Sequence, residues 1–123
     1  MLEISNKKFG KLVYVLLVLL VSSLSVRSVS AAPSDDFVIT VKTDNPGLSS
    51  DVQFIIPTTG GGYNYNVDCD DDGLDEYTAA TGNTTCSYSS AGTYTIRIKD
   101  NSGVGTGFPQ IYFDDGGDKQ KLL

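Results

Sequence analysis

The chain contains no histidine and only two cysteines among its 123 residues. Catalytic pairs of the Ser/His and Cys/His type need an imidazole as the base, so the sequence excludes both kinds of pair. The two cysteines, Cys69 and Cys86, are too far apart for a C-x-x-C pair, and no histidine is present to complete a zinc site. We therefore expect the protein not to be an enzyme.

Helical periodicity is missing after residue 33, and no internal repeat is visible. Short runs that alternate aromatic or β-branched residues with polar ones are present instead, and turn residues separate them, which indicates strands with one buried face. We expect seven extended segments: Phe37–Thr43, Val52–Ile56, Tyr63–Cys69, a short piece near Tyr77, Thr84–Tyr88, Thr93–Lys99 and Phe108–Phe113. This pattern predicts one all-β sandwich domain over residues 33–123.

The N-terminal 32 residues differ in composition from the rest of the chain. Lysines precede a short apolar run, Leu12 to Leu20, and the small residues Ser30-Ala31-Ala32 lead to a proline. This order is typical of a secretory signal peptide that is cleaved after either alanine. The alternative is a membrane-spanning anchor, but the apolar run is shorter than the roughly 20 residues that a span needs. We expect residues 1–32 to be a signal peptide, and the protein to be secreted or displayed on the cell surface.

Basic residues are scarce after the predicted cleavage site. Residues 33–123 contain 14 acidic and 5 basic residues, which gives a formal charge of −9. A domain with this charge repels nucleic acids and anionic lipids, so we expect no nucleic-acid partner. The acidic balance suits a soluble exported protein, and it suits cation binding.

The two cysteines lie on strands that are predicted to share one core. Alternation over Tyr63–Cys69 places Cys69 on the face with the aromatic residues, and places Asp68 on the other face. Cys86 shares a face with Tyr88. Cysteines that both point into the core of an exported domain predict a disulfide, which would close a loop of about 18 residues and contribute roughly 3 kcal/mol. The alternative is a pair of buried free thiols.

Six carboxylates lie within the nine residues from Asp68 to Glu76. Their order, D-x-D-x-D-G-x-x-E, matches the first nine positions of a calcium-binding loop, in which alternating oxygens converge on a hard cation. The predicted ligands are Asp68, Asp70, Asp72, the backbone carbonyl of Leu74, and Glu76. Position 12 is Ala79 where such loops have a bidentate glutamate, and no flanking helices are expected. The alternative is therefore a solvated acidic turn between two strands.

Two parts of the sequence resemble a known domain. The turn Val67–Gly73 and the later C-S-Y-S-S-A-G-T-Y-T-I resemble the Asp/Gly turn and the His-x-Tyr-x-x-x-Gly-x-Tyr motif of the polycystic-kidney-disease (PKD) domain. Nearly all of residues 36–123 resembles the N-terminal domain of BspA-like leucine-rich-repeat surface proteins of bacteria, through F-V-I-T-V-K-T-D-N-P-G, I-P-T-T-G-G-G-Y-N-Y-N-V-D and G-F-P-Q-I-Y-F-D-D-G-G-D-K-Q-K-L-L. Where the family pattern has an aromatic residue and a histidine, this chain has Cys69 and Cys86. A paired change of this kind is expected if a disulfide takes the place of an aromatic contact.

The resemblance implies an immunoglobulin-like fold of the PKD type. It implies structural roles for Tyr88, Gly92 and Tyr94, with Tyr88 packing inward and its hydroxyl bonded to the backbone, as in a tyrosine corner. It also implies a surface module that acts in adhesion or as a spacer, with an extracellular protein or polysaccharide as its ligand. Leucine-rich repeats would follow if the chain is a fragment of a longer protein. The alternatives are a calcium-dependent binding module and an accessory domain of an exported hydrolase.

Overall fold

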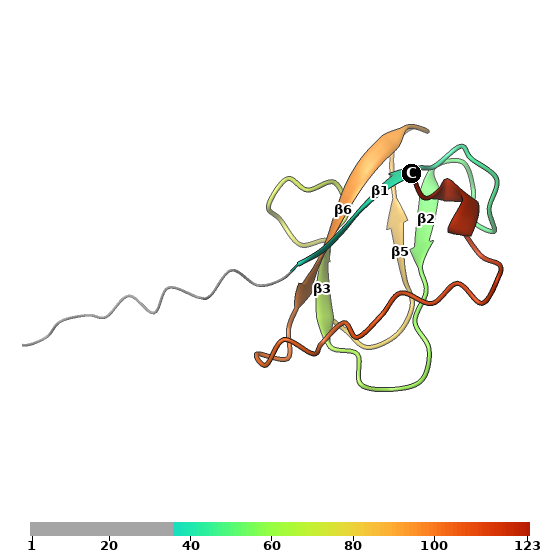
Figure 1. Cartoon of the computed structure of the whole chain (residues 1–123). Coiled ribbons are helices and arrows are strands. Elements are labelled where there is room, and N and C mark those ends of the chain that lie inside the picture. Colours follow the sequence, from blue (N-terminus) through green and yellow to red (C-terminus); the bar gives the residue numbers. More distant parts are fainter. Residues whose placement is uncertain (1–35) are drawn as a thin grey trace, which may run out of the picture. The chain divides into compact units, whose positions relative to one another are not determined.

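A computed structural model describes residues 36–123, so the predicted signal peptide lies outside the described residues. This part of the chain forms six β-strands and one short 3-10 helix (Figure 1). The elements are β1 Phe37–Lys42, β2 Gln53–Ile56, β3 Tyr65–Asp68, β4 Tyr77–Ala80, β5 Thr84–Ser87, β6 Thr93–Asp100 and η1 Lys119–Lys121. The prediction of an all-β domain is confirmed for these residues.

The strands form two antiparallel sheets that share one core. The larger sheet has the strand order β1-β6-β3-β4, and the smaller sheet pairs β2 with β5. Ile98 of β6 lies opposite Phe37 of β1 and Val67 of β3, so β6 joins the two halves of the larger sheet. Alternation turns the apolar residues of both sheets to the same interior, as in a β-sandwich. The core consists of Val41, Phe54, Ile56, Tyr63, Tyr65, Val67, Cys69, Cys86, Ile96 and Ile98.

The seventh predicted strand, Phe108–Phe113, is wrong. This stretch is irregular, because Pro109 has no N–H to donate to a ladder. Tyr112 donates its N–H to the carbonyl oxygen of Pro57, at 3.2 Å. The first phenylalanine of the stretch packs its ring against Tyr65, with 4.9 Å between ring centroids. The two phenylalanines of the stretch therefore pack against the core without belonging to a sheet.

The last six residues, Asp118–Leu123, are called the C-terminal segment below, and they cover the outer edge of β2 (dark red in Figure 1). The Asp118 carboxylate accepts the N–H of Ile55 at 2.7 Å. The Lys121 ammonium donates to the carbonyl oxygen of Gln53 at 3.0 Å. Two side chains thus make the hydrogen bonds that a neighbouring strand would otherwise make.

The C-terminal segment also covers the edge of β1. Leu122 forms an antiparallel bridge with Val41, and Leu123 donates its N–H to the carbonyl oxygen of Thr40 at 3.0 Å. Unpaired strand edges are templates for pairing with other chains. By satisfying backbone groups of β1 and β2, the C-terminal segment blocks one side of both sheets.

The loop after β6, residues 101–107, is held in place by the carboxylate of Asp100. This carboxylate accepts the hydroxyl of Ser102 and the N–H groups of Ser102, Gly103, Gly105 and Gly107. A Cβ atom at Gly107 would collide with the carbonyl oxygen of Asn64, so this position requires glycine. The hydrogen bond from the Ser102 hydroxyl is the largest cause that lowers the pKa of Asp100 below its ordinary value of 3.8.

We expect Asp100→Asn to lower the melting temperature at neutral pH, because an amide offers a single acceptor oxygen to these donors. The pKa of Asp100 is lowered in the folded state. Its contribution to stability is therefore fully present above the unfolded-state pKa and is lost as the pH falls through the folded-state pKa. The gap in melting temperature between wild type and variant should narrow as the pH falls below 3.8. Melts over an acid pH series measure this gap, with Asp51→Asn, on an exposed turn, as the control. A gap that does not change with pH would contradict the prediction.

Candidate functional site

Cys69 and Cys86 form a disulfide in the interior of the domain. The S–S distance is 1.99 Å and the Cα atoms are 5.6 Å apart. The two residues are 5% and 0% exposed. Cys69 directly follows β3 and Cys86 lies in β5, so the bond joins the larger sheet to the smaller one. The predicted disulfide is confirmed, and the alternative of buried free thiols is wrong.

Tyr88 lies beside the disulfide and is half-buried. Its hydroxyl donates to the carbonyl oxygen of Cys69 at 2.7 Å, and its ring stacks on Tyr94 with 3.6 Å between centroids. Gly92, in the turn between the two tyrosines, donates its N–H to the hydroxyl of Thr43 at 3.0 Å. Burial is the largest cause that raises the pKa of Tyr88, so this hydroxyl stays a donor over the ordinary pH range.

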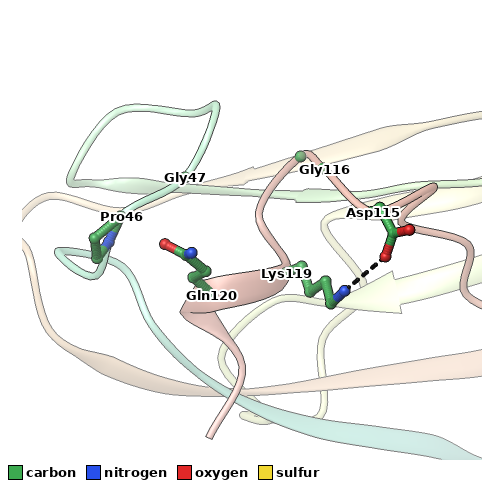
Figure 2. Close-up of a pocket in the computed structure, with 7 residues that line it drawn as sticks. Pro46, Gly47, Asp115, Gly116, Lys119 and Gln120 are labelled. Carbon is green, nitrogen blue, oxygen red and sulfur yellow. Dashed lines mark hydrogen bonds and ion pairs between the residues drawn. The ribbon is translucent and has the colours of Figure 1, made fainter.

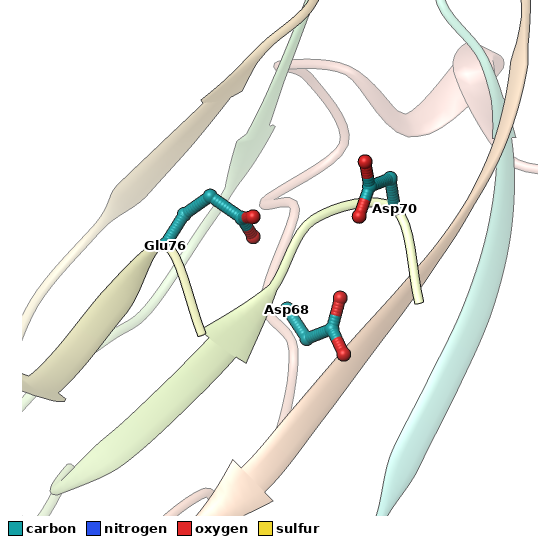
Figure 3. Close-up of side chains that lie close together, drawn as sticks. All are labelled: Asp68, Asp70 and Glu76. Atoms are coloured by element: carbon teal, nitrogen blue, oxygen red, sulfur yellow. The ribbon is translucent and has the colours of Figure 1, made fainter. Parts of the chain in front are cut away.

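Three carboxylates of the acidic loop come together where β3 ends and β4 begins (Figure 3). Oxygens of Asp68, Asp70 and Glu76 all lie within 4.8 Å of one another. Asp68 is the last residue of β3 and Glu76 immediately precedes β4, so the antiparallel pairing of these strands brings the two ends of the loop together. Carboxylate oxygens are the ligands that calcium prefers. This group is therefore the candidate cation site of the described residues.

Asp68 is fully buried, although alternation places it on the outer face of β3. The loop folds back over it, and the Asp68 carboxylate accepts the N–H groups of Asp72 at 3.1 Å and Gly73 at 2.9 Å. The ammonium of Lys99 lies 3.5 Å from the same carboxylate. These contacts replace the water that the charge loses on burial. Asp68 therefore holds the shape of the loop, whatever else it binds.

The other predicted ligands are arranged differently. The Asp72 carboxylate accepts the N–H of Leu74 at 2.8 Å and is not one of the three converging carboxylates. The side chain of Leu74 is exposed. Glu76 reaches back along the loop, and its Oε2 atom accepts the N–H of Cys69 at 2.6 Å. The loop thus brings together the carboxylates at positions 1, 3 and 9 of the predicted calcium pattern and uses the carboxylate at position 5 for its own turn.

Arg97 and Lys99 of β6 neutralise part of the charge of the loop. Arg97 Nε lies 2.6 Å from Asp71 and Lys99 Nζ lies 2.7 Å from Asp75. The hydrogen bond from Arg97 is the largest cause that lowers the pKa of Asp71. Arg97 and Lys99 lie two positions apart on β6, so both point to the same face of the strand, and the fold connects this face to the loop. That connection depends on the pairing of β3 with β6.

A polar pocket of about 310 Å³ lies beside the C-terminal segment (Figure 2). It is lined by Pro46, Gly47, Asp115, Gly116, Gly117, Lys119 and Gln120. The Lys119 ammonium lies 2.9 Å from the Asp115 carboxylate, which pairs the two charged groups of the lining. The rest of the lining, which is Pro46, three glycines and Gln120, carries no charge.

No protein-family model, curated protein or solved structure matches this chain. Within residues 36–123, no helix is long and apolar enough to cross a membrane. The class of protein is therefore defined by the fold and the site alone: a two-sheet β domain with an interior disulfide and an acidic loop beside it.

Proposed function

We propose that residues 33–123 form a non-enzymatic extracellular β-sandwich module of a bacterial surface or secreted protein, which acts in adhesion or as a structural spacer. The observation that carries this proposal is the interior disulfide that joins the two sheets. Such bonds persist in proteins that mature outside the reducing cytosol. The N-terminal sequence typical of a signal peptide and the formal charge of −9 that follows it support the same conclusion.

The proposed fold type is the immunoglobulin-like sandwich of PKD domains. The sequence resemblance supports this assignment, and so does the bond from the Tyr88 hydroxyl to the backbone beside the disulfide. A structural role is supported by the buried charged residues. Asp68, Asp118 and Lys121 each make hydrogen bonds to backbone groups, and these bonds fix loops in place.

Export is tested by producing the whole chain in a bacterium and following its N-terminus and its thiols. We expect the protein to be found outside the cytosol, to begin at residue 32 or 33, and to contain no thiol that reacts before reduction. N-terminal sequencing and mass spectrometry after alkylation measure these properties. An uncleaved chain that stays in the cytosol with two free thiols would contradict the proposal.

A binding assay on the exported protein distinguishes an adhesive module from a structural spacer. The protein is immobilised and exposed to extracellular-matrix proteins and to polysaccharides. Saturable binding to one of them would support adhesion, and binding to none of them would support a spacer.

A calcium-dependent binding module is the second candidate. It is favoured by the convergence of Asp68, Asp70 and Glu76, two of which are exposed to solvent. Like charges at this separation repel one another, and a bound cation would relieve the repulsion. The accessible oxygens of Asp70 and Glu76 would then be the main ligands, because both oxygens of Asp68 already accept backbone N–H groups.

If this site binds calcium, we expect millimolar calcium to raise the melting temperature by several degrees, because the ion binds only the folded state. Asp70→Asn should abolish the rise. Asp72→Asn should preserve it, because the Asp72 carboxylate lies outside the converging group. Melts with calcium and with a chelator measure the effect, and magnesium tests its specificity. An unchanged melting temperature, or an equal loss in both variants, would eliminate the site.

A further inference from the structure

The C-terminal segment fills a groove whose walls lie far from it in the sequence. Lys121 is fully buried, and its ammonium donates to the carbonyl oxygens of Ser49 at 3.1 Å, Ser50 at 2.7 Å and Gln53 at 3.0 Å. The hydroxyl of Ser49 lies 2.9 Å away as a fourth contact. An ammonium group has three hydrogens to donate, and three carbonyl oxygens accept them. This part of the groove is therefore built to recognise a primary ammonium group.

The other end of the groove recognises a carboxylate. Asp118 is 1% exposed, and its oxygens accept the N–H of Ser49 at 2.9 Å, the hydroxyl of Ser49 at 2.6 Å and the N–H of Ile55 at 2.7 Å. The Ser49 hydroxyl thus contacts both Asp118 and Lys121. The groove therefore binds the side chain of an aspartate and, three residues later, the side chain of a lysine.

Gly47 forms the wall of the groove against both side chains. A Cβ atom at this position would lie 2.5 Å from Oδ1 of Asp118 and 2.6 Å from Cε of Lys121. Real Cβ contacts are essentially never this short, and neither buried side chain can move away without breaking its hydrogen bonds. Gly47 therefore fits the groove to the C-terminal segment.

The residues that connect the segment to the rest of the chain adopt left-handed backbone conformations. Asp114 has φ of 47°, Asp115 has φ of 55° and Gly117 has φ of 63°. For the two aspartates this conformation is less favourable than an extended one. An extended connection would release this strain. Strained short hinges of this kind favour the exchange of the element that follows them between copies.

We propose that the C-terminal segment is exchangeable, and that the groove formed by residues 40–55 accepts Asp118–Leu123 from a second copy of this chain. The contacts would be the same as those within one chain, because every wall residue named above lies on the far side of the hinge. The partner is specified by the chemistry of the groove: a carboxylate, then an ammonium three residues later, then two residues that pair with the edge of β1.

Two variants of the exported protein test the exchange. Lys121→Met damages the segment and leaves the groove intact. Gly47→Ala damages the groove and leaves the segment intact. One variant is isotopically labelled, and the two are unfolded together in urea without reductant and refolded at high concentration. Only exchange can then place an undamaged segment in an undamaged groove. We expect native mass spectrometry to detect a mixed dimer, and we expect its melting temperature to exceed that of either variant refolded alone.

Three results would overturn the proposal. One is a mixture that contains only monomers with the melting temperatures of the separate variants. The second is a mixed dimer that is no more abundant than the dimers of each variant alone, because this would place the contact outside the groove. The third applies if a variant does not fold by itself: the mixture must then restore folded protein, and its failure to do so would exclude exchange.

Discussion

Replacement of both Cys69 and Cys86 by alanine is expected to lower the free energy of unfolding by about 3 kcal/mol. The bond spans a sequence separation of 17 residues, so its loss releases a sizeable loop in the unfolded chain. It also removes the covalent link between the two sheets of a small domain. The chain has no tryptophan, so urea unfolding followed by circular dichroism and tyrosine fluorescence is the suitable measurement.

Reduced wild-type protein is the matched control for this variant. If it unfolds at the same urea concentration as the double alanine variant, the lost stability belongs to the bond and not to the packing of the sulfur atoms. A double variant as stable as the oxidised wild type would show that the disulfide does not contribute to folding stability.

Asp118→Ala is expected to cost about 3 kcal/mol of stability. The change leaves the part-buried N–H groups of Ser49 and Ile55 without their acceptor, and it removes a negative charge that interacts with the buried ammonium of Lys121. Burial alone would raise the pKa of Asp118. The hydrogen bonds from Ser49 and Ile55 and the charge of Lys121 outweigh it, and the pKa is lowered. Urea unfolding at neutral pH measures the loss.

Asp118→Asn is a milder change at the same position than Asp118→Ala, and Asp115→Asn is its control. The side chain of Asp115 is 98% exposed and its partner Lys119 is 55% exposed, so the loss of this ion pair should change stability by less than about 1 kcal/mol. Because the pKa of Asp118 is lowered in the folded state, its contribution should be lost as the pH falls through that pKa. Equal effects of Asp115→Asn and Asp118→Asn would contradict this account of the C-terminal segment.

The strands were predictable because their side chains alternate with a period of two. Runs such as Phe37–Lys42 and Thr93–Asp100 carry apolar residues at every second position, and each is a strand in the structure. Phe108–Phe113 is equally rich in apolar and aromatic residues, yet it forms no strand because a sheet also needs N–H donors in register, and Pro109 lacks one. Alternation reports which side chains are buried, and the pairing of strands depends on partners elsewhere in the chain.

The disulfide was predictable because both cysteines shared a face with core residues. The arrangement of the acidic loop was harder to predict. Its sequence pattern predicted that Asp72 would act as a ligand with Asp68 and Asp70, whereas Asp72 bonds to the backbone within the loop. The choice between a ligand and a turn-forming residue depends on which N–H groups the loop presents, and these depend on its backbone conformation.

The buried position of Lys121 could not have been predicted from sequence. The stretch from Gly116 onward is polar and charged, and lysine is almost never fully buried unless it is paired. Burial of Lys121 requires the carbonyl oxygens of residues 49–53 to point to one place. That convergence is a property of the folded loop.

The disulfide has a further consequence for a protein exposed to proteases. It closes a covalent ring from Cys69 to Cys86, and this ring contains residues 69–76 of the acidic loop and all of β4. Residues 70–74 are exposed to solvent and accessible to cleavage. A single cut there would break the backbone but release no fragment, because the disulfide still connects the two new ends through the ring. The nicked domain would keep its mass apart from one added water, and its two sheets would stay joined until the disulfide was reduced.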